Sequence, residues 1–128
     1  MRLIGYVALG GAIGSVARFG LGAMLQSREA GAFPWGTFVI NITGALLLGF
    51  LMRVAMGSTD FSPAMRAFLT VGFCGGYTTF STYSYETAIL IESGHVGRAA
   101  IYALASALLA LAGTFGGFWL AREYLDRL

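Results

Sequence analysis

The sequence predicts an all-α membrane protein with four transmembrane helices in one domain, residues 1–128. Three observations predict this class. Hydrophobic residues make up 57% of the 128 residues and charged residues only 11%, whereas a soluble domain carries about 25% charged residues. The mean hydropathy is +0.74. Apolar stretches of the ~20 residues that cross a bilayer recur four times, which leaves no length for a separate soluble domain.

The expected spans follow from these stretches and from the residues that bound them. The apolar run after Met1-Arg2 can imitate a signal peptide, but the apolar spans behind it favour a transmembrane helix. Pro34 and an interfacial Trp mark the start of the second span, and Trp119 lies near the end of the fourth. The four expected spans are Leu3–Leu25, Trp35–Met56, Met65–Ile91 and Arg98–Leu120.

The third span contains a stretch that makes a poor lipid-facing helix. Residues 72–86 read GFCGGYTTFSTYSYE. Gly costs about 1 kcal/mol per helix position relative to Ala, and bare backbone and hydroxyls are costly in hydrocarbon unless protein or ligand satisfies them. We therefore expect this helix to be broken near Gly75–Thr79 and interpret the segment as the functional part of a small transport protein. Carbonyls freed at the break suit a hard cation such as Na⁺, although neighbouring side chains could equally fill a kink.

Polar and aromatic side chains within the spans are the candidate site residues. Asn41 lies mid-span and marks either a hydrogen bond between helices or a pore. Phe80 and Tyr83 share one helix face, as do Thr79 and Tyr83. Ring edges carry partial positive charge and can contact an anion. On periodicity alone, however, an aromatic pair packed in a bundle core is favoured.

The fourth span carries a hydroxyl stripe, and two spans carry charges. Tyr102, Ser106 and Thr114 share a face that Ala110 interrupts, and Ser or Thr hydroxyls also commonly bond back to their own helix.

A charge within a span is a functional hypothesis by default. Arg18 could draw anions into a water-filled mouth or anchor to headgroups, and Glu86 could pair with an arginine.

Several classes are excluded or disfavoured. Cys74 is the only cysteine, so neither an intrachain disulfide nor a thiol metal cluster is possible. The net charge of +2 is scattered and predicts no nucleic-acid partner. No nucleophile–base pair or phosphate loop is present, so we expect no enzyme.

The arginines and glycines give weaker indications of topology and packing. Five arginines lie on the side of the termini against two or three opposite, a bias small enough to permit insertion both ways up. The spacings Gly10/Gly14, Gly72/Gly76 and Gly113/Gly117 predict close helix packing, within one chain or between chains.

Residues 75–86, GGYTTFSTYSYE, resemble the GGxTTFSTFSxE signature of the Fluc (CrcB) fluoride channels. Residues 36–44 and 10–19 are similar to the second-span and first-span motifs of that family. The resemblance covers nearly the whole chain. It implies an antiparallel, dual-topology homodimer with two pores that export fluoride passively across the inner (plasma) membrane of a prokaryote and so relieve fluoride toxicity.

The resemblance also implies roles for individual residues. Asn41 would donate to the ion, Phe80 would be the first ring of the family's phenylalanine pair, Arg18 would lie in the vestibule and Glu86 would border the pore. Tyr83 stands where the family usually has the second phenylalanine, so it keeps the ring edge and adds a hydroxyl. The other implied pore residues are Thr79, Ser81, Thr82, Tyr102, Ser106 and Thr114. Carbonyls of Gly75 and Thr78 from both subunits would hold a structural Na⁺ at the dimer centre.

Two other classes of protein remain as alternatives. Small proton-coupled multidrug exporters are also four-span dual-topology dimers, but they centre on a carboxylate in the first span, where this chain has Arg18 and no acid. A non-conducting subunit of a larger membrane complex would use the glycine spacings, yet it would leave the hydroxyl-rich third span unexplained.

Overall fold

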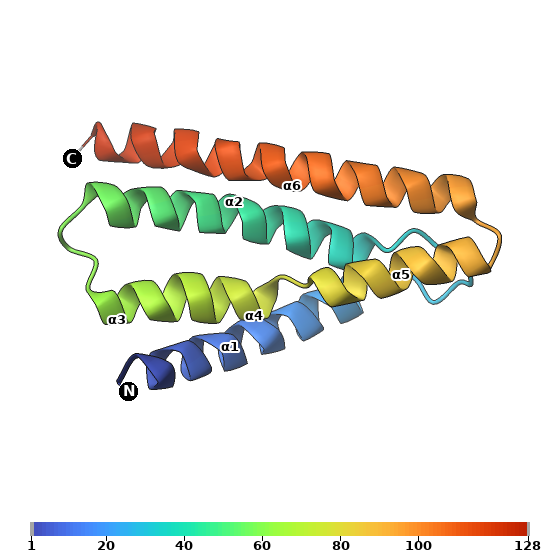
Figure 1. Cartoon of the computed structure of the whole chain (residues 1–128), viewed down its shortest axis with the longest axis horizontal. Coiled ribbons are helices and arrows are strands. Elements are labelled where there is room, and N and C mark those ends of the chain that lie inside the picture. Colours follow the sequence, from blue (N-terminus) through green and yellow to red (C-terminus); the bar gives the residue numbers. More distant parts are fainter. Residues whose placement is uncertain (1, 128) are drawn as a thin grey trace.

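The computed structural model describes residues 2–127, and all its regular elements are helices (Figure 1). Three are long: α1 (Arg2–Leu25), α2 (Trp35–Gly57) and α6 (Val96–Leu125). Between α2 and α6, four short pieces follow one another and together make the third rod. They are α3 (Pro63–Arg66), the π-helical η1 (Ala67–Cys74), α4 (Gly75–Tyr77) and α5 (Phe80–Glu92).

The predicted fold of four helical spans with a broken third is confirmed. Within residues 2–127, α1, α2 and α6 are long and apolar enough to cross a membrane. The third span is divided, so none of its pieces reaches that length. Helix boundaries agree closely with the sequence prediction, except that α6 runs on to Leu125 rather than ending near Leu120. Both ends of the described chain lie at the same end of the bundle (Figure 1), as four spans require.

The break in the third span lies at Thr78–Thr79 and not at the glycines before it. Thr78 and Thr79 have extended backbone, with ψ values of 158° and 115°. Gly75 and Gly76 are helical. The expected region of the break was therefore right, but its cause is not glycine flexibility, and the polar partner that holds it open is described below.

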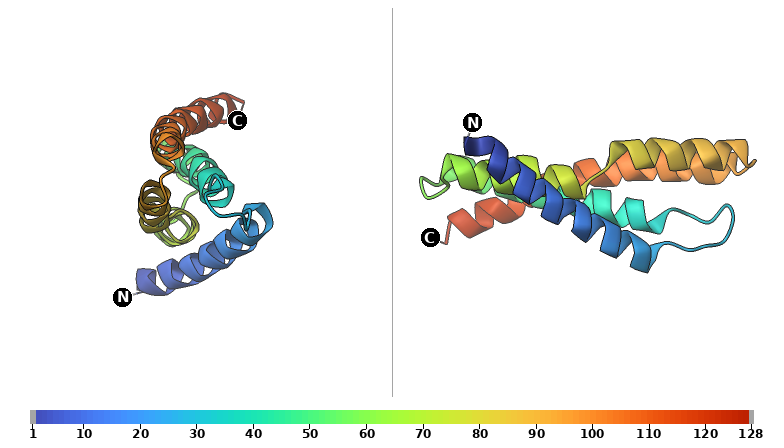
Figure 2. Two further views of the ribbon diagram at one scale, coloured as in Figure 1. Left: turned by 90° about the vertical axis from the view of Figure 1, so that its right-hand side faces the viewer. Right: turned by 90° about the horizontal axis from the view of Figure 1, so that it is seen from below.

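Several glycines allow neighbouring helices to approach one another closely. A methyl group at Gly76 would lie 2.5 Å from the Gly11 carbonyl oxygen, and one at Gly72 would lie 2.8 Å from the Val7 carbonyl oxygen. Side chains larger than hydrogen would therefore push α1 away from η1 and α4. The predicted glycine spacings thus act within a single chain: Gly10/Gly14 and Gly72/Gly76 lie where α1 crosses η1 and α4 (Figure 2), and Gly113/Gly117 lie where α6 packs on α2.

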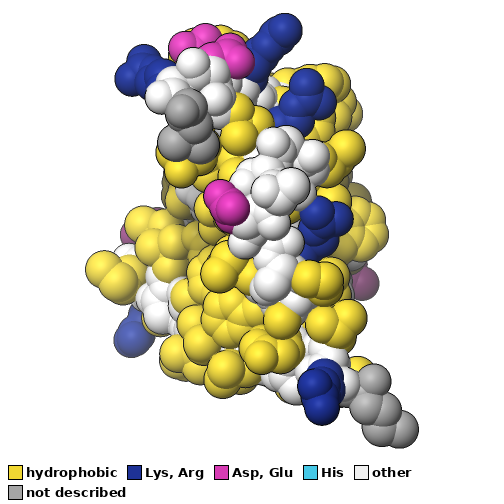
Figure 3. All heavy atoms as spheres, turned by 90° about the vertical axis from the view of Figure 1, so that its left-hand side faces the viewer, with side chains coloured by type: hydrophobic (Ala, Val, Ile, Leu, Met, Phe, Trp, Pro, Cys, Tyr) yellow, Lys and Arg dark blue, Asp and Glu magenta, His cyan; other side chains and the backbone are white. Residues whose placement is uncertain are grey.

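The helices leave much apolar surface uncovered. Helix α2 is central, with α6 lying along it and α1 packing on the third rod (Figure 2). Figure 3 looks onto the end that carries the termini and shows arginine side chains spaced around that end, with hydrophobic side chains between them. Large exposed side chains such as Phe19, Met24 and Phe80 are typical of a surface that faces lipid or a partner chain.

Candidate functional site

Two cavities meet at the break in the third rod. We call the first the Arg18 cavity; it has a volume of about 430 Å³. It is lined by Ser15, Arg18, Phe19, Gly22, Ala23, Gln26, Gly36, Thr37, Ile40, Thr79, Thr82 and Glu86. The second, the Asn41 cavity, has a volume of about 340 Å³. It is lined by Asn41, Gly44, Ala45, Leu48, Thr78, Thr79, Phe80, Tyr83, Ser106, Ala107, Ala110 and Thr114.

The two cavities collect most of the residues singled out in the sequence. Arg18, Thr82 and Glu86 line the first and Asn41, Phe80, Tyr83, Ser106 and Thr114 line the second. Thr79 lines both, so this one residue stands at the partition between them. Ser81 and Tyr102 line neither cavity. Ser81 Oγ lies 3.3 Å from Thr79 Oγ1, and Tyr102 is fully buried.

Asn41 holds the break open through a pair of hydrogen bonds. The Thr79 N–H donates to Asn41 Oδ1 at 2.8 Å, and Asn41 Nδ2 donates to the Thr79 carbonyl at 3.0 Å. In an unbroken helix the Thr79 N–H would donate to the Gly75 carbonyl four residues earlier. The amide side chain therefore replaces helical bonding. The sequence left open whether Asn41 marks a hydrogen bond between helices or a pore. The hydrogen bonds between helices are present and Asn41 also lines a cavity; the second N–H of its amide remains a potential donor.

Thr79 also caps the helix that follows. The Thr82 N–H donates to Thr79 Oγ1 at 3.2 Å, and the Thr79 hydroxyl donates to Thr82 Oγ1 at 3.0 Å. Helix α5 thus begins at the partition between the cavities. Its first turn carries backbone N–H groups without helical acceptors and the positive end of the helix dipole, an arrangement that favours anions.

Glu86 is held by two hydroxyls rather than by the arginine that the sequence offered as one partner. Tyr102 donates to Glu86 Oε2 at 2.7 Å and Thr37 donates to Oε1 at 2.9 Å. Each carboxylate oxygen therefore has a partner from a different helix, α6 and α2. This fixes Glu86 at the wall of the Arg18 cavity. Thr37 was not predicted as a site residue; its only signal is a hydroxyl inside the apolar run that leads to Asn41.

Aromatic rings form a continuous contact along the Asn41 cavity and the α1–α2 loop. The ring centroids of Phe80 and Tyr83 are 5.4 Å apart, as are those of Tyr83 and Tyr102. Phe33 meets Tyr102 edge-on at 5.4 Å. The Tyr83 hydroxyl donates to the Ala103 carbonyl at 3.1 Å, so it is turned toward the backbone of α6. The predicted Phe80–Tyr83 pair is a real ring contact, with Tyr83 half-buried and Phe80 78% exposed.

The hydroxyl stripe on α6 is uneven. Ser106 is 5% exposed, and its Oγ is buried with no hydrogen-bond partner within residues 2–127. Thr114 instead donates to the Ala110 carbonyl of its own helix at 3.1 Å, the ordinary alternative considered for this stripe. A buried hydroxyl without a partner is costly. Ser106 is therefore the member of the stripe that calls for a ligand or a water.

The expected cation ligands, Gly75 and Thr78, lie just before the break and at its first residue. Gly75 has no non-neighbouring atoms within 4 Å of the position a side chain would take. Its carbonyl has lost the Thr79 N–H to Asn41, as described above. The Thr78 hydroxyl and N–H both donate to the Cys74 carbonyl. Within residues 2–127 no group of three or more His, Cys, Asp or Glu residues could hold a metal ion, so a cation here depends on backbone carbonyls, which suit Na⁺.

Comparison with known proteins adds independent information. The family model described as CrcB-like protein, Camphor Resistance (CrcB) matches residues 5–118. A protein of Geobacter sulfurreducens named fluoride-specific ion channel FluC is 45% identical over 123 residues, which are 96% of this chain and 99% of that protein. Proteins of the same name from Thermus thermophilus and Rhodospirillum centenum are 46% and 43% identical, over 88% and 95% of this chain and 89% and 97% of theirs.

Proposed function

This chain belongs to the CrcB family, and from that premise we propose that it is a fluoride-specific ion channel whose ion path runs through the Arg18 and Asn41 cavities. It is a multi-pass membrane protein and not an enzyme. The observation that carries the path is the partition at Thr79, where the two cavities meet beside the Asn41 amide and the start of α5. Two groups that attract anions, the Asn41 amide and the start of α5, meet at this one point of the proposed path.

Fluoride is small and strongly hydrated, so its passage depends on close donors that replace lost water. Three sources lie along the Asn41 cavity: the second N–H of the Asn41 amide, the unpartnered Ser106 hydroxyl, and the ring edges of Phe80 and Tyr83. Arg18 and Thr82 would receive the ion in the Arg18 cavity, where Glu86 borders the path. Thr114 also lines the Asn41 cavity. Ser81, which contacts Thr79, and Tyr102, which donates to Glu86, complete the proposed polar lining through these contacts.

Passive flow suffices for export. Hydrogen fluoride crosses membranes as a neutral weak acid and dissociates inside the cell, so the anion accumulates. An inside-negative potential drives a monovalent anion outward with ~2.3 kcal/mol per 100 mV. The relatives compared above are bacterial, and we place the channel in the inner (plasma) membrane of a prokaryote. Proton-coupled drug exchange is not supported, because the first span carries no carboxylate.

We further propose that two copies pair antiparallel to complete two pores. In one chain the Asn41 cavity is an open groove, and Phe80 is 78% exposed beside it. Gly75 and Thr78 are three residues apart in the third rod, with Thr78 at the break itself, and the space over Gly75 is open. A second copy on this face would cover the groove and bring four carbonyls, those of Gly75 and Thr78 from each chain, around one structural Na⁺.

The proposed function is tested by purifying the protein, reconstituting it in liposomes and recording anion efflux with ion-selective electrodes. We expect fluoride to leave without any proton gradient, and chloride to be retained. Empty liposomes from the same preparation are the control. Fluoride movement that required a proton gradient would point to an exchanger, and retention of fluoride under all conditions would contradict a channel.

A further inference from the structure

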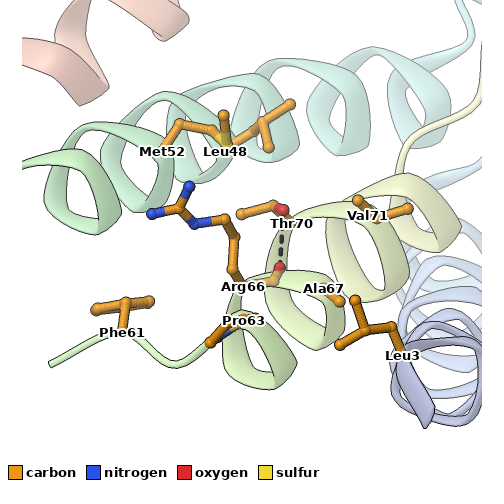
Figure 4. A pocket seen from close by; sticks show the side chains of 9 residues that line it. All are labelled: Leu3, Leu48, Met52, Phe61, Pro63, Arg66, Ala67, Thr70 and Val71. Carbon is orange, nitrogen blue, oxygen red and sulfur yellow. Dashed lines mark hydrogen bonds between the residues drawn. The ribbon is translucent and has the colours of Figure 1, made fainter. Parts of the chain in front are cut away.

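A third cavity lies at the end of the bundle that carries the termini, and no role has been assigned to it. This Arg66 cavity has a volume of about 710 Å³ and opens between α2, the start of the third rod and the beginning of α1 (Figure 4). Its walls include Leu48, Met52, Phe61, Thr70 and Val71. Leu48 also lines the Asn41 cavity, so the two spaces adjoin along one face of α2.

Within residues 2–127, Arg66 is the one charged side chain that lines this cavity. Its Nη2 donates to the Ala55 carbonyl near the end of α2 at 2.6 Å, and Figure 4 shows the guanidinium reaching from the third rod toward α2 beside Met52. A guanidinium has five N–H donors, so this bond fixes the group and leaves others free. Among the described residues, no acidic side chain lines either the Arg66 cavity or the Asn41 cavity. The positive charge is therefore not neutralised by the walls.

We propose that the Arg66 cavity is the second mouth of the ion path and that Arg66 concentrates fluoride there. This inference rests on the proposed function. At ~30 Å³ per water molecule, 710 Å³ holds on the order of twenty waters, enough for fluoride to enter with its hydration shell. Apolar walls around a single charge focus its field and raise the local concentration of the counter-ion. The ion then meets a cation at each end of its route, Arg18 at one and Arg66 at the other.

The test uses Arg66→Cys in the full-length protein, reconstituted in liposomes. At low ionic strength we expect fluoride efflux to fall about three- to tenfold. A cationic methanethiosulfonate reagent, which restores the positive charge, should recover most of the flux, and an anionic reagent should lower it further. The native Cys74 is buried and should not react. The loss should shrink in an impermeant salt, because the Debye length falls from ~30 Å at 0.01 M to ~3 Å at 1 M.

Two matched variants separate the charge from the structural bond to Ala55. Arg53→Cys lies at the same end but lines a different cavity, so its flux should respond to neither reagent. Arg66→Lys keeps the charge and should retain most of the flux even if Arg66→Cys folds poorly. A loss in Arg66→Cys that is equal at all ionic strengths, or a thiol there that does not react because lipid or a second copy fills the cavity, overturns the inference. Fluoride efflux by the unchanged protein in the same assay shows separately whether the proposed function holds.

Discussion

At the scale of single residues, the Asn41–Thr79 pair decides the geometry of the site. Two hydrogen bonds of 2.8 and 3.0 Å join an α2 side chain to backbone in the third rod. The sequence could mark Asn41 because an amide in the middle of an apolar span needs partners. It could not identify Thr79 as the partner, because their contact spans 38 positions and depends on how two helices pack.

Replacing Asn41 by Leu should damage both stability and conduction. The Thr79 N–H and carbonyl would lose their partners in a buried place, at a cost of about 1–3 kcal/mol each. We expect a large drop in fluoride efflux together with a lower unfolding temperature in detergent. Thr87→Val is the control, because the Thr87 hydroxyl donates to the Tyr83 carbonyl of its own helix, α5. Wild-type flux in Asn41→Leu would mean that the amide only packs.

Replacing Tyr83 by Phe should change conduction little. The hydroxyl is bonded to the Ala103 carbonyl and so is directed away from the proposed path. That carbonyl keeps its helical hydrogen bond, so the loss of stability should be at most about 1 kcal/mol. The fluoride efflux rate should stay within about twofold of the wild-type rate, since the ring edge is retained. A much larger change in either direction would place the hydroxyl in contact with the ion.

At the scale of elements, the close helix packing at the glycines and the break in the third rod have separate causes. Hydropathy predicted the spans well because the length of an apolar run is a local property. The position of the break, two residues beyond the glycines, depends on the distant amide of Asn41 and could not be derived from local composition. The cavities likewise arise from helix spacing, that of α1, α2 and the third rod around the Arg18 cavity and that of α2, the third rod and α6 around the Asn41 cavity. The sequence shows only the residue types that line them.

Adding one methyl group should distinguish glycines in close contacts between helices from glycines in open space. Gly76→Ala would place a methyl 2.5 Å from the Gly11 carbonyl oxygen, which forces α1 and α4 apart. We expect a clearly lower unfolding temperature. Gly116→Ala, where nothing lies within 4 Å, should be neutral or stabilising by up to ~1 kcal/mol, the helix preference for Ala. Equal effects of the two substitutions would show that the α1 contact is looser than described.

At the scale of the whole molecule, one chain leaves the face with the Asn41 cavity uncovered. The Asn41 cavity is open, the Phe80 ring is exposed and the face of the third rod that carries Gly75 is bare. A lipid-facing surface needs no such combination of glycine, free carbonyl and hydroxyl groups. The pattern fits the proposed pairing of two copies.

A bulky side chain at Gly75 should therefore disrupt pairing without unfolding the chain. Nothing in a single chain lies near this position, but a second copy would approach it closely in the proposed dimer. We expect Gly75→Leu to shift the protein from dimer to monomer in size-exclusion chromatography with light scattering, and to abolish fluoride efflux. Gly5→Leu, also in open space within one chain, is the control and should remain dimeric. An unchanged dimer in Gly75→Leu would rule out this face as the contact.

The partition at Thr79 has a consequence for how the cell maintains its membrane potential. Among the described residues, Thr79, which is 8% exposed, is the one that lines both cavities, so an ion on the proposed path would cross a constriction there rather than a wide aqueous tunnel. Such a narrow crossing can stay permanently open. The abundant solutes that support respiration and nutrient uptake would not leak through it. The membrane potential would therefore be maintained while fluoride leaves the cell.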